Sequence, residues 1–365
     1  MSSSKRVFVS FHWLLDWGIR VLNRGQDGKP NRLHIANSCR AFLTPQMIAR
    51  SMREAIEPDL APEFQTLTSR ELGHLVRDTM VAANVPEKDA VAFAEEVLRH
   101  SFIKGDSKAK KAKAKKTAAA AANPNSAPVE EKDPLLVESV KFSVLVLNEV
   151  LAATQRKIAG QAPQLDLISK ALEKDKCIGA VLWGRMVAGH QAFEIVRASH
   201  LSGVIGVSNS EADIETYVAK DDLKVERGAA YFNERERRPG LGYGWNGFDV
   251  EQILKRYSLD ETINILVKLY RFVSRPFIRG QHFPVPYGMV EIGGNCMEWH
   301  LAFQPPITSN DPATESAQRL REYHEKLKVT WGSDISQVQE FGIGIPAINA
   351  ENFLRETLRA QLGGK

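Results

Sequence analysis

Cysteine is scarce in this chain. The 365 residues contain only Cys39, Cys177 and Cys296. No two of them form a CxxC pair, so their spacing does not support a zinc site or a redox centre, and we expect free thiols. No apolar run approaches the roughly 18–20 residues of a membrane span. Residues 1–6 lack the apolar core of a signal peptide, so we expect a cytoplasmic protein with no membrane partner.

The motifs of common catalytic classes are also missing. The chain has no GxxxxGK[ST] loop, no HExxH and no GxSxG. The glycine-rich segment 240–244 neither follows a clear strand nor opens a helix, which argues against a dinucleotide loop. Ser199 and His200 are adjacent in an expected strand and point to opposite faces, and the adjacent acids Asp221 and Asp222 fit a solvated turn. We therefore expect no catalytic residue, no metal site and no cofactor.

Positive charge is present in two segments. The formal net charge is +4. Residues 1–54 hold nine basic residues against three acidic ones, and residues 104–134 hold eight lysines against four acidic residues. The rest of the chain is acidic overall. A basic amino-terminal segment of this kind suits the binding of a polyanion on one face.

Helix and strand signals are interleaved without a regular βαβ repeat, which predicts an α+β fold. The expected strands are 5–13, 40–43, 139–147, 177–183, 194–207 and two near 287–303. The expected helices are 45–57, 68–83, one after Pro86, one from Asn148, 165–176, 249–257, 259–274, 312–328 and 349–361. Residues 105–133, rich in lysine and alanine, have little to bury and are expected to be a disordered or weakly helical insertion.

The helix expected after Thr44 separates a basic face from an apolar one. On a helical wheel, Gln46, Arg50 and Arg53 fall within an arc of about 60°, opposite the apolar positions. Guanidinium groups bind phosphate through paired hydrogen bonds. Two interpretations stay open: a ridge that binds a nucleic-acid backbone, or a solvated face paired with the nearby glutamates. The basic residues that precede the helix are Arg24, Lys29, Arg32 and Arg40.

Several segments, in order and with their spacing kept, resemble the backbone subunit of Cascade, the type I-E CRISPR surveillance complex (the CasC family of the RAMP superfamily). They cover most of the chain and are His12 at the end of the first strand, 22–24, 40–53, 178–186, 198–200, 221–223 and 228–232. The departures indicate a divergent member: the family's GG is Ala36-Asn37 here, and its SSQ is Thr44-Pro45-Gln46.

The resemblance implies a modified RRM-like (ferredoxin-like) palm with a helical fingers insertion and an extended thumb loop. The palm with its thumb would take residues 1–57 and 135–365, the thumb being about 198–232. The fingers would take residues 58–176, including the disordered segment 105–133. Copies would stack head to tail along one crRNA, beside other Cascade subunits, and would present the guide for base pairing with target DNA in antiviral defence.

The resemblance also implies roles for individual residues. The RNA-binding residues would be Asn23, Arg24, Arg40, Gln46, Arg50 and Arg53, with Lys29 and Arg32 in place of the family's turn lysine. Arg185 and Met186 would lie near the thumb contact, although Met186 is equally a candidate core methionine. We further predict contacts to target DNA from the inserted lysines, the alternative being an inert linker. These lysines are Lys108, Lys110, Lys111, Lys113, Lys115 and Lys116.

Two other functions are weighed against this one. An RNA-cleaving RAMP endonuclease would use a loop aspartate, and Asp27 lies in a loop, but no matching motif surrounds it. A general RRM-type RNA-binding protein would carry a strand with a basic-glycine-aromatic pattern, which residues 7–11 lack. We therefore expect an RNA-binding protein that is not an enzyme.

Overall fold

The computed structural model forms two compact units, Met1–Pro58 with Ala198–Lys365, and Asp59–Arg197. The residues that it describes are 6–35, 37–102, 133–137, 139–187, 190–211, 213–220, 229–237, 240–294, 297–331 and 336–363. The second unit is an insertion in the first. This second unit includes all of residues 135–197. The sequence-based boundaries differ, because they end the helical insertion at residue 176 and assign residues from 135 onward to the palm.

The first unit is built on a seven-stranded antiparallel sheet with the order β13-β12-β1-β9-β6-β3-β2. Its strands are β1 (Phe8–Gly18), β2 (Arg32–Ile35), β3 (Ser38–Leu43), β6 (Ser199–Gly206), β9 (Gly240–Asp249), β12 (Tyr287–Gly293) and β13 (Ser336–Gly342). Two hairpins stand outside this sheet: β7 (Asp213–Lys220) with β8 (Ala229–Arg237), and β10 (Phe277–Ile278) with β11 (Gln281–His282).

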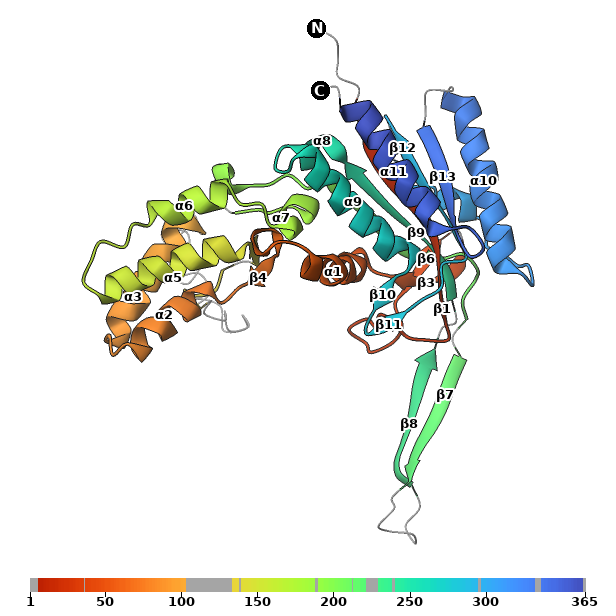
Figure 1. The fold of residues 1–365 in the computed structure, drawn as a ribbon. Coiled ribbons are helices and arrows are strands. Elements are labelled where there is room, and N and C mark those ends of the chain that lie inside the picture. The colour runs from red at the N-terminus through yellow and green to blue at the C-terminus, as the bar shows by residue number, and fades with distance from the viewer. Residues whose placement is uncertain are drawn as a thin grey trace, which may run out of the picture. The chain divides into compact units, whose positions relative to one another are not determined.

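Helices cover both faces of the sheet (Figure 1). On one face, the rings of Phe11 and Phe248 pack together at 5.5 Å, and Tyr270 of α9 joins them. On the other face, Leu320 of α10 belongs to a core with Trp299 and the sheet residues. The helices of this unit are α1 (Pro45–Ile56), η1 (Glu57–Asp59), α8 (Val250–Leu254), α9 (Leu259–Ser274), η4 (His300–Phe303), α10 (Pro312–Trp331) and α11 (Ala347–Leu362).

The second unit is mainly helical and has its own core. Leu72, Phe93, Val97 and Val150 contribute to that core and are almost completely buried. Its helices are η2 (Pro62–Phe64), α2 (Leu72–Ala82), α3 (Glu87–Ser101), α5 (Val144–Ile158), α6 (Asp166–Glu173), α7 (Ile178–Trp183) and η3 (Gln191–Phe193). One short antiparallel pair joins β4 (Leu67–Ser69) to β5 (Val140–Phe142).

Several expected elements are wrong in type. Residues 178–183 form helix α7 rather than a strand, and strand 139–147 shrinks to β5 before α5 begins. In both places the apolar residues run without a clear period, and such runs do not separate a buried strand from a buried helix. The second strand expected near 287–303 is a 3-10 turn, η4. The helix expected from residue 68 begins only at Leu72, because Leu67–Ser69 is a strand.

The glycine-rich segment 240–244 is part of strand β9. Its alternate glycines lie against tryptophan rings of the neighbouring strand β1. A Cβ atom on Gly240 would come within 2.0 Å of the Trp17 ring, and one on Gly244 within 2.7 Å of the Trp13 ring. The glycines therefore make room for large side chains, as glycine in a strand often does. The argument against a dinucleotide loop agrees with this placement.

A buried polar network lies on the α10 face of the sheet. The His12 ring bonds Tyr243 Oη through Nδ1 at 2.9 Å and Glu291 Oε2 through Nε2 at 3.0 Å. It also stacks on Trp299, with ring centroids 3.6 Å apart. Burial lowers the pKa of His12 below 6.5, although the hydrogen bond to Glu291 acts in the opposite direction. The pKa of His324, on the far side of Trp299, is lowered for the same first reason.

The described part of the chain bears out the expected free thiols. Cys39 and Cys177 are free thiols, and Cys296 lies outside the described residues. Burial raises the pKa of Cys177 well above its usual range. Among the helices that the structure describes, none is both long enough and apolar enough to cross a bilayer.

We predict that the first unit loses stability as pH falls below about 6.5, where an unfolded histidine gains a proton that buried His12 does not accept. The unfolded state then binds more protons, which lowers the free energy of unfolding by at most about 1.4 kcal/mol per pH unit for each such histidine. His12→Gln should flatten this dependence, and His34→Gln, on an exposed strand residue, should not. Urea titrations followed by tryptophan fluorescence test this, and an unchanged slope in His12→Gln contradicts it.

Candidate nucleic-acid interface

The loop after β1 is held against the start of α1 by Asn23. Its Oδ1 atom accepts a hydrogen bond from the Thr44 backbone N–H at 3.1 Å and from Asn31 Nδ2 at 2.6 Å. Arg24 and Pro30 form an isolated β-bridge that closes the loop, and the Arg24 guanidinium donates to the Gly28 carbonyl. Asn23, predicted to bind RNA, thus has a structural role that positions the basic loop.

Helix α1 has the two faces that its sequence predicts. Thr44 Oγ1 accepts a hydrogen bond from the Met47 N–H at 3.4 Å and so caps the N-terminus of the expected helix. Ile48, Met52 and Ile56 are buried. On the other side, the ridge residues have different exposures: Gln46 and Arg50 are exposed and Arg53 is half-buried.

Both ridge arginines are paired with glutamates one turn away. Arg50 Nε lies 2.6 Å from Glu54 Oε1, and Arg53 Nε lies 3.7 Å from Glu57 Oε2. The Arg50 side chain is 74% exposed, and exposed helix pairs contribute at most a few tenths of a kcal/mol. A phosphate can therefore replace Glu54 at little cost. In the free chain the two arginines are therefore paired with glutamates, and the Arg50 guanidinium remains accessible to a ligand.

A cleft of about 470 Å³ lies between the loop after β1 and the base of the β7–β8 hairpin, which extends from the sheet (Figure 1). Lys29 Nζ is 3.8 Å from Glu236 across it, and the Arg235 guanidinium lies 5.3 Å from the centre of the Tyr217 ring. The lining residues are Arg24, Asp27, Gly28, Lys29, Ile214, Tyr217, Glu234, Arg235 and Glu236.

Sequence reasoning missed the hairpin's share of this cleft. The charges alternate along 234–237, Glu-Arg-Glu-Arg, and that alternation is the signal of a two-stranded ribbon with both faces in water. The expected thumb, 198–232, instead includes β6, which lies in the sheet, and stops before the end of β8. Cations and carboxylates face each other here, so a bound phosphate must compete with Glu234 and Glu236.

Arg40 is not available to RNA, and its predicted role is wrong. Arg40 is only 1% exposed to solvent. Its guanidinium donates to Ser38 Oγ at 2.6 Å and to four backbone carbonyls at 2.8–3.3 Å. All five N–H donors of an arginine are thereby used inside the protein. The carbonyls belong to Gly206, Val207, Phe303 and Gln304.

Arg185 is also a structural residue rather than an RNA ligand. Its side chain and that of Asp175 are fully buried, with Nη1 2.5 Å from the carboxylate. It further donates to the carbonyls of Phe193 at 2.8 Å and Leu172 at 2.6 Å. Met186 next to it is 73% exposed, so the core-methionine interpretation is wrong. The structure thus separates two adjacent predicted residues, one inside the second unit and one on its surface.

Of the remaining predicted residues, some are exposed in the structure and the others lie outside the described residues. Arg32 is exposed on β2, at the edge of the sheet. Asp27 is exposed in its loop and accepts a hydrogen bond from the Lys29 N–H at 3.0 Å, as turn aspartates do. Within the described ranges, no three acidic, histidine or cysteine side chains gather as a metal site would require.

Several predicted positions lie outside the described residues: Ala36, Lys108, Lys110, Lys111, Lys113, Lys115, Lys116, Asp221 and Asp222.

The fold and this surface define an α+β protein with a helical insertion and with exposed basic side chains on α1, on the edge strand β2 and in the loop after β1. The family model described as CT1975-like protein matches residues 9–359. The chain belongs to that family. No curated protein sequence matches the chain.

Two similar solved structures show the same fold over nearly their whole length. One chain, from a "CRISPR RNA-guided surveillance complex, pre-nicking", has a TM-score of 0.75 and 15% identity, and the match covers 97% of this chain and 100% of that one. Another, from a "CRISPR RNA-guided surveillance complex", has a TM-score of 0.66 and 16% identity, covering 97% and 99%.

We predict that Arg40→Met destabilises the first unit strongly, because it leaves buried carbonyl groups without a donor. Each such group costs about 1–3 kcal/mol, so a loss of at least about 3 kcal/mol in the free energy of unfolding is expected. Arg32→Met, on an exposed residue of the next strand, should change it by less than about 0.5 kcal/mol. Urea unfolding of both variants measures the difference, and equal stability would refute the structural role of Arg40.

Proposed function

We propose that the chain is the crRNA-binding backbone subunit of a Cascade-type surveillance complex of type I-E, acting in antiviral defence in the cytoplasm. The observation that carries this proposal is the fold likeness, which spans 97% of this chain and 100% of a chain from an RNA-guided surveillance complex. Membership of the CT1975-like family over residues 9–359 supports it. In this proposal the sheet unit is a modified RRM-like palm, the helical unit the fingers and β7–β8 the thumb.

The accessible basic groups suit a guide whose sequence varies. A protein that serves many guides must bind phosphates and leave base edges free for pairing. Arg50 on α1, Arg24 and Lys29 in the loop, and Arg32 on β2 are all exposed in one unit. We propose that these residues, with Gln46 and Arg53, contact the RNA backbone. Copies of the chain would assemble head to tail along the crRNA, together with other Cascade subunits.

The proposal has two further parts, a role for the inserted lysine-rich segment and the absence of catalytic activity. We propose that the lysines of 105–133 contact target DNA, because a run of positive charge attracts the phosphates of a nucleic-acid strand. We also propose that the chain is not an enzyme. The alternatives are an RNA-cleaving RAMP endonuclease that uses Asp27 and a general RRM-type RNA-binding protein.

Replacing both ridge arginines tests the RNA assignment. Arg50→Ala with Arg53→Ala should leave the fold intact and remove crRNA and assembly, since each lost charged hydrogen bond to phosphate costs roughly 1.5–3 kcal/mol before screening. The matched control is Glu54→Gln with Glu57→Gln, which removes the competing carboxylates and should tighten RNA binding. Size-exclusion chromatography with extraction of bound RNA measures both. If the arginines serve only their ion pairs, neither double variant changes RNA content.

We predict no cleavage of bound RNA or target by the purified complex in Mg²⁺ or Mn²⁺. Metal-assisted cleavage needs acidic ligands placed around the ion, and Asp27 instead caps its own turn. Denaturing gels after incubation with labelled RNA provide the measurement. Cleavage that disappears in Asp27→Ala would establish the endonuclease alternative, whereas a mixed population of cellular RNAs in the complex would favour the general RNA-binding alternative.

A further inference from the structure

The β10–β11 hairpin has an unusual turn. Phe277 pairs with His282 and Ile278 with Gln281, so Arg279 and Gly280 form a two-residue loop. Both loop residues have positive φ, 50° for Arg279 and 80° for Gly280. Such turns usually place Asn, Asp or Gly first, and a long side chain at positive φ is uncommon. The hairpin therefore presents an arginine at its tip where a smaller residue would fit more easily.

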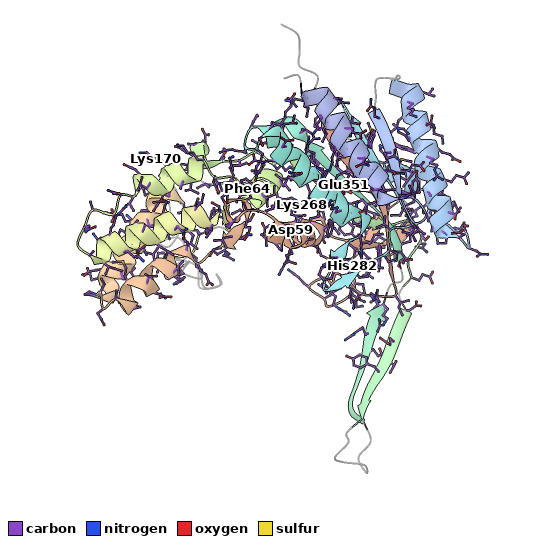
Figure 2. The ribbon with its side chains drawn as sticks, in the orientation of Figure 1. Asp59, Phe64, Lys170, Lys268, His282 and Glu351 are labelled. Atoms are coloured by element: carbon purple, nitrogen blue, oxygen red, sulfur yellow. The ribbon has the colours of Figure 1, made fainter. Side chains whose placement is uncertain are left out.

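Two aromatic rings are exposed on this hairpin. Phe277 is 45% exposed, and its ring centroid lies 4.9 Å from that of His282, which is labelled in Figure 2. Ile278, between them in the hairpin, is fully buried and anchors the strand. An exposed aromatic face on an anchored strand is a platform on which an unpaired base stacks.

The charge of this region has one sign. Residues 271–290 contain three arginines and one histidine and no acidic residue. Arg271 pairs with Glu351 at 2.8 Å, whereas Arg275 and Arg279 are exposed and have no ion pair with any residue that the structure describes. They differ in this respect from Arg50, Arg53 and Lys29, which all face carboxylates.

The hairpin adjoins the elements that carry the other basic residues. Strand β10 contacts helix α1, and the Arg20 guanidinium lies 5.4 Å from the centre of the Phe283 ring. The Asp16 N–H donates to the Pro284 carbonyl at 3.2 Å. The end of β1 and Arg20 in the loop after it therefore contact the two residues that directly follow the hairpin, within the same unit.

We propose that the β10–β11 hairpin is a further binding site for single-stranded RNA. A base stacks on the exposed face of Phe277, and the neighbouring phosphates contact Arg275 and Arg279. This proposal rests on the proposed function and extends the RNA surface from α1 and the loop after β1 to a third element, which carries both stacking and charge. Strands of any sequence fit, because every base has a face that stacks.

The test uses the full chain and a fluorescein-labelled single-stranded RNA of mixed sequence, with binding followed by fluorescence anisotropy over a series of KCl concentrations. Phe277→Leu should weaken binding about fivefold or more, since stacking is lost, while Phe277→Tyr keeps the ring and should bind as the wild type does. Arg275→Ala with Arg279→Ala should make the salt slope shallower by up to about 1.4, or about 0.7 for each phosphate contact. The charge-matched control is Lys326→Ala with Lys328→Ala, on the α10 face of the sheet.

The outcomes separate this proposal from the proposed function. If the wild-type chain does not bind the RNA, the proposed function fails and the hairpin site fails with it. If Arg50→Ala with Arg53→Ala weakens binding while the Phe277→Leu and arginine variants of the hairpin match the wild type in affinity and salt slope, only the hairpin site is overturned. Weaker binding to duplex DNA with unchanged binding to single-stranded RNA would also overturn it.

Discussion

The buried guanidinium of Arg40 is the interaction on which the surface proposed to bind RNA depends. Strand β3 pairs with β6 at only two positions, Phe42 with Ile205 and Leu43 with Val204. Beyond them, four of the five N–H donors of Arg40 bond backbone carbonyls and fix β3 to the chain at 206–207 and 303–304. Because Thr44 and α1 follow β3 directly, this anchor also determines where the ridge of α1 lies.

A glycine makes this close pairing feasible. Gly203 of β6 has a φ of 80°, and a Cβ atom there would lie 2.3 Å from the Leu43 carbonyl oxygen. A side chain would therefore push β3 away from β6 just before α1 begins. Asn23 acts from the other side, since its amide oxygen accepts the Thr44 N–H. The start of α1 is thus fixed by a buried arginine, a glycine contact and an asparagine in the preceding loop.

The sequence predicts the local structure of α1 well, but it predicts poorly whether an individual arginine binds a ligand or stabilises the fold. A capping threonine, a proline at the first turn and a regular spacing of apolar residues are all local signals, and the helix, its cap and its buried face are confirmed. Whether an arginine binds a phosphate or a set of carbonyls depends on burial, which arises from strands distant in sequence. Arg40 and Arg185 were therefore misassigned, while the neighbouring Met186 proved to be exposed.

The same limit explains the elements that were mistaken or missed. Helix α7 lies in an apolar stretch whose residues are almost all buried, so no polar face marks its period. Strand β13 is rich in glutamine and pairs only at the edge of the sheet, where tertiary contacts override a weak strand propensity. The hairpin β10–β11 has two residues in each strand, too few for a pattern, although its Arg-Gly turn and lack of acids are visible in the sequence.

The distribution of ion pairs suggests how the proposed assembly would hold RNA. Arg50, Arg53 and Lys29 each face a carboxylate in the free chain. The binding free energy of a phosphate at each of them is therefore only the difference between the phosphate contact and the carboxylate contact that it replaces. One copy should therefore bind RNA weakly and release it easily in salt. Copies that share one strand convert each later contact into an intramolecular one, and the combined affinity rises steeply without any stronger contact. Weak contacts in each copy would then favour full-length assembly on a guide over scattered binding to other RNA.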